Sequence, residues 1–180
     1  MPPVTAPVEL STARLRLRRP TSRDAEAIFA YASDPEITRY MAWPRHQTLD
    51  DSRAYLSFAD DEWRQRGVGP YLALAADGEV IGSTGLQLLA PHRAATGYLL
   101  VRRWWGQGLA TELARAMVEL ARSLGLARLE ADCVAEHAAS AHVLEKAGFA
   151  FEGVRRAYLM APNLPGDDPV DVRSYACVFC

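Results

Sequence analysis

The sequence has few cysteines, no long apolar run and no basic-then-apolar pattern at its N-terminus. Its three cysteines, Cys133, Cys177 and Cys180, are an odd number without metal-ligand spacing. This excludes a disulfide framework or zinc site, predicts no metal, and fits the reducing cytoplasm. No apolar stretch approaches the roughly 18 residues that a membrane span needs, and the N-terminus lacks a basic-then-apolar pattern. We therefore expect a cytoplasmic protein without membrane contact.

A clustered basic face is also missing. The chain carries 20 Lys and Arg against 22 Asp and Glu, with a net charge of -2. Nucleic-acid binders need positive charge gathered on one surface, so we expect no nucleic-acid partner. At 180 residues and 49% hydrophobic content, the chain is able to bury one substantial core. We expect a loose tail over residues 1–12, which include Pro2, Pro3 and Pro7, and one domain over 13–180.

Helix-like and strand-like segments alternate along the chain. A helix after Thr21 and a helix after Thr48 begin with capping boxes, and Asp77-Gly78 predicts a type I′ hairpin turn. The pattern predicts a mixed α/β fold. The expected strands are 15–18, 71–76, 79–89, 94–101, 128–134, 149–160 and 170–179, and the longer helices are 22–32, 49–66, 109–124 and 138–147.

The most informative segment is the glycine turn that contains Gly106 and Gly108. It follows the strand at 94–101 and precedes a helix that begins at about Leu109. The first turn of a helix leaves several N–H groups unpaired, and the helix dipole adds positive charge at the same point. Glycine lets the backbone approach an anion closely. We therefore expect residues 106–111 to bind a phosphate or pyrophosphate through their backbone N–H groups.

Two well-known kinds of phosphate site fit the residues of this turn poorly. A P-loop needs Gly-Lys-Ser/Thr, whereas the sequence has Gly108-Leu109-Ala110. A dinucleotide site would use the acidic residues Glu130 and Asp132, but Thr111 occupies the place of the third glycine and the chain has only one βαβ unit. A turn that is glycine-rich for steric reasons alone remains the alternative.

Three ordered motifs resemble the GCN5-related N-acetyltransferase (GNAT) superfamily. Arg103-x-x-Gly106-x-Gly108 matches the Q/R-x-x-G-x-G/A signature of that superfamily. Residues 137–153 resemble the N-x-x-S…L-E-K-x-G-F-x-x-E-G block of its RimJ/RimL-type ribosomal-protein acetyltransferase subgroup. Residues 171–176 resemble the closing D-V-x-x-Y-A strand of that subgroup. The resemblance runs from about residue 15 to residue 179.

The resemblance implies a fold and a co-substrate. The expected GNAT fold has a mixed central sheet of about seven strands with helices on both faces. The sheet splays between the fourth and fifth family strands, here 94–101 and 128–134. The pantetheine arm of acetyl-CoA lies in that gap, and its pyrophosphate meets the glycine turn. The residues that the resemblance assigns to the cofactor are Tyr98, Leu99, Leu100, Arg103, Gly106, Gln107, Gly108, Leu109, Ala110, Thr111, His137 and Ser140.

Ser140 is the expected catalytic group, because the family pattern places it near the CoA sulfur. Its O–H would protonate or hydrogen-bond the departing thiolate. A serine in the first turn of a helix also bonds its own backbone, which is the structural alternative. Arg103 either adds charge near the phosphates or is simply solvated.

Two departures from the family pattern affect the chemistry. His137 stands where the family has asparagine, and its donor and acceptor layout differs. Ala95-Thr96 replaces an acidic residue, so no carboxylate on that strand is available as a base. His92 is the nearest titratable alternative, unless it is merely solvent-exposed. Tyr158 is a weaker candidate acid.

The sequence thus predicts an N-acetyltransferase that moves acetyl from acetyl-CoA to a primary amine by direct attack. Trp43, between Met41 and Pro44, is expected to line the acceptor site. The missing carboxylate favours an α-amine, because at pH 7 an α-amine is neutral about a hundred times more often than a lysine amine. The acceptor remains open among a protein N-terminus, a peptide, an amino acid and a small molecule, as does the choice between monomer and homodimer. The alternative class is a CoA-binding module without turnover.

Overall fold

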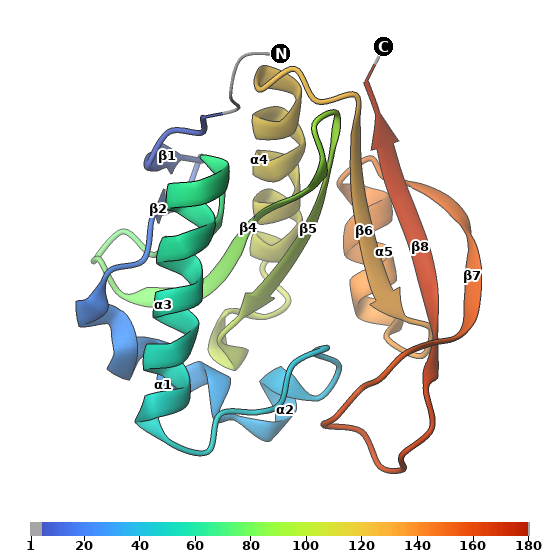
Figure 1. The fold of residues 1–180 in the computed structure, drawn as a ribbon, viewed down its shortest axis with the longest axis horizontal. Coiled ribbons are helices and arrows are strands. Elements are labelled where there is room, and N and C mark those ends of the chain that lie inside the picture. The colour runs from blue at the N-terminus through green and yellow to red at the C-terminus, as the bar shows by residue number, and fades with distance from the viewer. Residues whose placement is uncertain (1–4, 180) are drawn as a thin grey trace.

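The computed structural model describes residues 5–179, which form one eight-stranded sheet in the order β1-β2-β3-β4-β5-β6-β8-β7 (Figure 1). Neighbouring strands are antiparallel except β5 and β6, which run parallel. The mixed sheet expected from the sequence is confirmed. The strands are β1 (Glu9–Ser11), β2 (Arg16–Arg18), β3 (Pro70–Leu74), β4 (Val80–Ala90), β5 (Arg93–Leu100), β6 (Arg128–Val134), β7 (Ala150–Leu159) and β8 (Val170–Val178).

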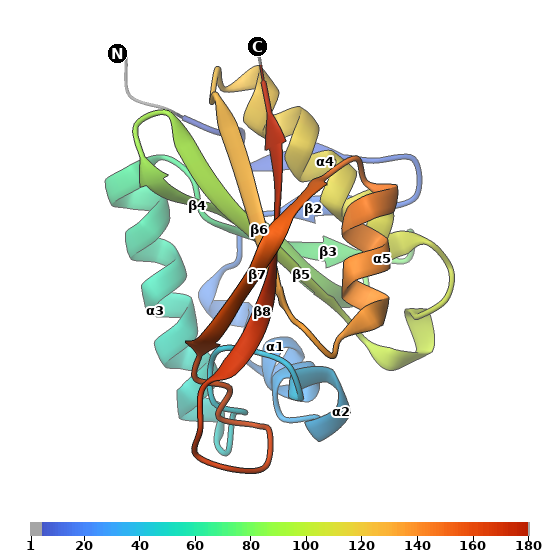
Figure 2. The same ribbon diagram turned by 90° about the vertical axis from the view of Figure 1, so that its right-hand side faces the viewer.

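Helices cover both faces of this sheet, as Figure 2 shows with α3 on one side and α4 and α5 on the other. The capping boxes expected at Thr21 and Thr48 are both present, closed by Asp24 and Asp51. The helices are α1 (Ala25–Ala32), α2 (Pro35–Thr38), α3 (Leu49–Arg66), α4 (Leu109–Ser123) and α5 (Ala138–Lys146), with 3-10 turns at Ser22–Asp24 and Arg102–Trp104.

The two faces of the sheet bury separate apolar clusters. On the α4 and α5 face, Leu113 and Met117 are fully buried, as the apolar stripe of the sequence predicted. On the other face, Ile28 of α1 and Leu56 of α3 pack with Leu72 of β3. Burial on both faces makes the central strands a rigid floor on which a site is built.

The sheet opens between β5 and β6. These strands pair only where Arg93–Ala95 faces Arg128–Glu130. Beyond that point β6 continues to pair with β8, while β5 continues to pair with β4. The remainder of β5 therefore has a free edge. These strands are the fourth and fifth of the family order, so the expected splay is confirmed.

The N-terminal segment differs from the loose tail predicted over residues 1–12. Residues 1–4 lie outside the described part, but residues 9–11 form β1, the strand beyond the seven expected. Ala6 is buried and donates its N–H to the Gly67 carbonyl at 2.8 Å. The buried Tyr71 donates its hydroxyl to the Pro7 carbonyl at 2.6 Å. The prolines of this segment led to the prediction of a loose tail. The segment is nevertheless held in place, because the buried Tyr71 hydroxyl needs a hydrogen-bond acceptor and the Pro7 carbonyl supplies it.

The hairpin between β3 and β4 is present, but its turn is not type I′. Gly78 has φ 89° and donates its N–H to the Ala75 carbonyl at 2.9 Å. A type I′ turn also needs a positive φ at Asp77, and Ala157 is the one non-glycine residue with positive φ among residues 5–179. Ala75 and Glu79 close a three-residue loop in which only the glycine is left-handed.

Candidate active site

The glycine turn enters α4 with two left-handed residues, Gly106 at φ 74° and Gly108 at φ 76°. The first N–H of α4 with an acceptor in the helix is that of Glu112, which bonds the Gly108 carbonyl at 3.1 Å. The amides of residues 109–111 precede it and have no acceptor within the helix. No neighbouring atom lies within 4 Å of the space that a Cβ on Gly106 would occupy. The turn is open on the side where an anion would approach.

Arg14 holds this turn, a contact that the sequence did not reveal. Its Nη1 donates to the Gln107 carbonyl at 2.9 Å, and its Nε donates to Glu112 at 2.7 Å. Thr12 adds a hydroxyl bond to the same carboxylate at 2.6 Å. Burial of Glu112 acts to raise its pKa, but the bonds from Thr12 and Arg14 outweigh burial and hold the pKa below its ordinary value. The carboxylate is therefore ionised and braces the turn.

The free edge of β5 presents alternate residues to the gap. Val101 donates its N–H to Ile81 of β4 at 2.8 Å. Main-chain groups alternate in direction along a strand, so those of Leu100 and Tyr98 point toward the gap. Leu99, which was expected at this edge, directs its main chain to β4 instead. The Trp105 indole donates to the Leu100 carbonyl at 2.7 Å, which leaves the N–H of Leu100 for a ligand.

Tyr98 spans the gap to α5 and meets Ser140. Its hydroxyl donates to the Ser140 carbonyl at 3.0 Å and lies 3.0 Å from Ser140 Oγ. Burial raises the pKa of Tyr98, so its phenol keeps its proton at neutral pH. The expected catalytic hydroxyl thus lies directly across the gap from the free strand edge.

A groove of about 540 Å³ runs past this pair of hydroxyls. Tyr55 and Phe58 of α3 border it on one side, and β6 and the start of α5 border it on the other. Among the described residues no lysine or arginine lines it. Further residues that line it include Tyr40, Met41, Ala42, Trp43, Glu62, Gln87, Ala95, Thr96, Asp132, Cys133, His137 and Leu159.

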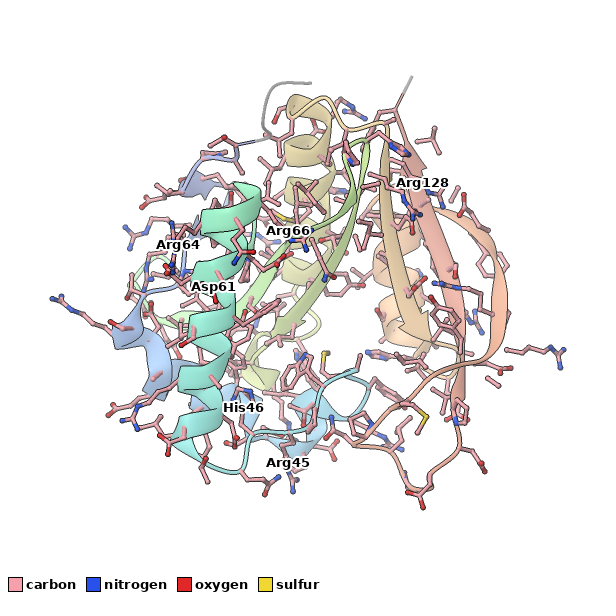
Figure 3. The ribbon with its side chains drawn as sticks, viewed as in Figure 1. Arg45, His46, Asp61, Arg64, Arg66 and Arg128 are labelled. Carbon is pink, nitrogen blue, oxygen red and sulfur yellow. The ribbon has the colours of Figure 1, made fainter. Side chains whose placement is uncertain are left out.

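Both carboxylates of the groove are already paired. Glu62 accepts a bond from Arg66 at 3.0 Å, and Arg66 also bonds the Leu88 carbonyl of β4. Figure 3 shows Arg66 reaching from α3 toward β4. Asp132 pairs with Arg155 of β7. Strand β5 has no carboxylate at Ala95-Thr96 to act as a general base. Within the described chain, no unpaired carboxylate from another element lines the groove in its place.

His137 lies at the start of α5 and lines the same groove. Its ring stacks on Tyr40 with centroids 4.4 Å apart and planes at 20°. Burial lowers the pKa of His137, so its imidazole is neutral at pH 7. The residue in the family asparagine position thus contacts the acceptor side of the groove as well as the gap. Trp43, predicted as substrate-lining, lies in the same wall.

Three other candidates lie away from the groove. Arg103 forms an ion pair with Glu79 of the β3–β4 turn. His92 is exposed in the β4–β5 turn. Tyr158 is 54% exposed on β7, with the Arg155 guanidinium 3.7 Å from its ring centroid. None of the three is brought near Ser140.

Cys133 is the thiol closest to the chemistry, but it is unsuited to attack. It lines the groove from β6, and burial raises its pKa to about 11. The thiolate is the nucleophilic form, and with this raised pKa the thiol form dominates at pH 7. Residues 5–179 contain no group of three or more His, Cys, Asp or Glu side chains placed to hold a metal ion.

Comparisons with known proteins assign this site to a family. A family model described as an acetyltransferase (GNAT) domain matches residues 14–150. YoaA of Bacillus subtilis (strain 168), an uncharacterized N-acetyltransferase, is 35% identical over 165 residues, which cover 89% of this chain and 93% of YoaA. The chain therefore belongs to the GNAT acetyltransferase family, and its class of activity is N-acetyl transfer.

More distant relatives include proteins with named acceptors. The [ribosomal protein uS5]-alanine N-acetyltransferase of Escherichia coli (strain K12) is 26% identical, with 85% of this chain and 84% of that enzyme covered. The structure of RimL, a ribosomal L7/L12 α-N-protein acetyltransferase, in complex with coenzyme A has TM-score 0.81 at 22% identity, with 97% of each chain covered. The microcin C7 self-immunity acetyltransferase MccE, with acetyl-CoA and AMP, has TM-score 0.84 at 18% identity, covering 98% and 99%. These structures confirm the GNAT fold, and the expected RimJ/RimL resemblance is confirmed.

No helix within the described residues 5–179 is both long and apolar enough to cross a bilayer.

Proposed function

We propose that this chain transfers acetyl from acetyl-CoA to the α-amino group of a protein N-terminus, peptide, amino acid or small molecule. The observation that carries the proposal is the free β5 edge, which faces Ser140 across the splay at the rim of the groove. A strand edge without a partner accepts an extended ligand that supplies pseudo-strand hydrogen bonds. The N–H of Leu100 is available for such a bond.

Acetyl-CoA fits the groups along this path. The amides of residues 106–111 suit its pyrophosphate, and the edge at Tyr98 and Leu100 suits its pantetheine amides. We assign His137 to a contact with the pantetheine arm, and Ser140 to the sulfur. Arg103 would need to leave Glu79 to reach the phosphates, so Arg14 is the better-placed cation at the turn.

The reaction then needs no covalent enzyme intermediate. The neutral amine nitrogen attacks the thioester carbonyl carbon, the C–S bond breaks, and one amine proton finally resides on the CoA sulfur. Ser140 stabilises the departing thiolate through its hydroxyl, while Tyr98 fixes the position of that hydroxyl. A β5 main-chain N–H meets the developing oxyanion. Holding both substrates in one groove supplies the orientation that the attack requires.

The pairing of both groove carboxylates supports an α-amine as acceptor. A lysine amine with pKa near 10.4 is neutral in only about one molecule in a thousand at pH 7, whereas an α-amine is neutral in roughly one in ten. The difference amounts to about 3 kcal/mol of deprotonation that the protein would have to supply for lysine. The acceptors in the names of the uS5-alanine and RimL enzymes are α-amines too.

Two matched peptides test this function. One is a glycine-rich pentapeptide with a free N-terminal alanine, and the other has a blocked N-terminus and an internal lysine. We expect thiol release from acetyl-CoA with the first peptide, with a rate that rises through the pKa of its α-amine. Acetylation of the lysine peptide alone would refute the α-amine assignment. If no thioester is cleaved with either peptide, with alanine or with a panel of small amines, the proposed activity is wrong. The alternative, a CoA-binding module without turnover, would then be supported.

A further inference from the structure

The only asparagine of the chain, Asn163, joins two loops that are far apart in sequence. It lies in the segment 160–169 that connects β7 to β8, and its side chain is half-buried. Its Nδ2 donates to the carbonyls of Thr38 at 2.8 Å and Trp43 at 2.9 Å. Its Oδ1 accepts the N–H of Arg45 at 2.8 Å. Figure 1 shows this β7–β8 segment lying against the region of α2.

These three bonds fix the segment 38–46, which we call the acceptor wall. Tyr40, Met41, Ala42 and Trp43 are consecutive residues of this wall, and all line the groove. At Tyr40 the wall is also attached to the cofactor side by the stack on His137. The wall is thus held at Trp43 and Arg45 by one side chain and at Tyr40 by another.

An asparagine is well suited to this position. Its amide offers two donors and one acceptor in a plane, and all three are used here on main-chain groups. An ionised aspartate has no donor, so it would keep the Arg45 bond and lose the other two. It would also place a negative charge against two carbonyl oxygens.

We propose that Asn163 is a positioning residue that sets the acceptor wall and thereby the affinity for the amine acceptor. The proposal rests on the function proposed above. Asn163 does not line the groove, so it acts through Tyr40 and Trp43. Its loss should affect the acceptor and spare acetyl-CoA, because its bonds reach none of the residues assigned to the cofactor.

The test compares Asn163→Ala and Asn163→Asp with Asp168→Ala, an exposed change in the same loop. The free N-terminal alanine pentapeptide and acetyl-CoA are the two substrates. For both Asn163 variants we expect the pentapeptide KM to rise about tenfold, as losing about 1.4 kcal/mol of binding predicts. Acetyl-CoA affinity, measured by calorimetry, should stay within about twofold, and Asp168→Ala should match the wild type.

Hydrogen exchange gives a readout that does not depend on turnover. Amides of residues 38–46 should exchange faster in Asn163→Ala than in the wild type, while those of α3 stay protected. Unchanged exchange in 38–46, an unchanged pentapeptide KM, or an equal loss of acetyl-CoA affinity would overturn the proposal. If the wild type cleaves no thioester, the proposed function fails, and the exchange data still decide whether Asn163 holds the wall.

Discussion

Arg14 and Glu112, 98 residues apart in sequence, form a salt bridge of 2.7 Å beside the glycine turn. The same arginine also bonds the Gln107 carbonyl within the turn. One side chain from the N-terminal hairpin thus fixes both the first turn of α4 and the loop that leads into it. These bonds therefore brace the turn in the conformation that exposes the amides of residues 109–111.

Replacement of Arg14 by alanine should therefore weaken acetyl-CoA binding, because the turn loses its brace and the proposed pyrophosphate site loses a nearby cation. We expect about a tenfold rise in Kd and a loss of about 1–2 kcal/mol in unfolding free energy, because the half-buried Glu112 carboxylate loses its charged partner. Calorimetry and denaturant unfolding measure the two effects. Arg16→Ala is the matched control, because Arg16 lies two residues away and, within residues 5–179, pairs only with the exposed Glu9 at 3.8 Å. An unchanged Kd in Arg14→Ala would show that the turn holds its shape without the brace.

Gly108→Val should sharply reduce acetyl-CoA binding. A β-branched residue at φ 76° is strained by about 1–2 kcal/mol, and its side chain would stand at the anion path. Gly125→Val is a close control, because Gly125 has φ 72° at the other end of α4. A Cβ there would meet no atom within 4 Å, and a Cβ on Gly108 would meet only Arg14 Nη2, in ordinary contact at 3.7 Å. Both variants should lose similar stability, but only Gly108→Val should lose acetyl-CoA affinity. Equal acetyl-CoA affinities for the two variants would show that the glycine turn does not bind the cofactor.

Ser140→Ala should lower kcat, by up to roughly 100-fold if thiolate departure limits the rate, and leave acetyl-CoA affinity nearly unchanged. Tyr98→Phe should give a smaller decrease, because it removes only the hydroxyl that holds Ser140 at 3.0 Å. Steady-state kinetics of both variants and of the double variant are the measurement. Effects of residues that act as a unit are not additive, so the double variant should resemble Ser140→Ala. A wild-type rate in Ser140→Ala would assign Ser140 a purely structural role.

His137 should make stability depend on pH at mildly acidic values. Burial lowers the pKa of His137 in the folded state, because the charged imidazolium is poorly solvated there. The unfolded chain then binds more protons as pH falls below the ordinary value near 6.5. The free energy of unfolding should accordingly decrease as pH falls, by at most about 1.4 kcal/mol per pH unit. His137→Asn should lack this component in unfolding curves between pH 7 and 5. If the free energy of unfolding of the wild type and of His137→Asn depends on pH in the same way, His137 is not the source of the pH dependence.

Much of the fold follows from local sequence signals. The capping boxes at Thr21 and Thr48 and the apolar stripe of α4 depend on residues close together in the chain, and all three are confirmed. The splay depended on the family resemblance, since no local pattern indicates where two parallel strands separate.

The contacts that hold the glycine turn and the acceptor wall were missed by sequence reasoning, and they are long-range. The Arg14–Glu112 pair and the Asn163 bonds join residues about 100 or more positions apart, and neither partner has a local signal. The short strand β1 was missed because its three residues are too few to show the alternation that predicts a strand. Trp43 was predicted to line the acceptor site, but nothing in the sequence indicated that Asn163 holds this wall.

The unpaired edge of β5 links ligand supply to the lifetime of the folded chain. Any molecule that pairs with the native edge and not with the unfolded chain raises the unfolding free energy by mass action, by about 2.7 kcal/mol at a hundred times its Kd. Both acetyl-CoA and the released CoA carry pantetheine amides, which under the proposed function would pair with this edge. The ratio of the two in the surrounding solution would then set how much of the enzyme is free for turnover, while their sum protects it from unfolding.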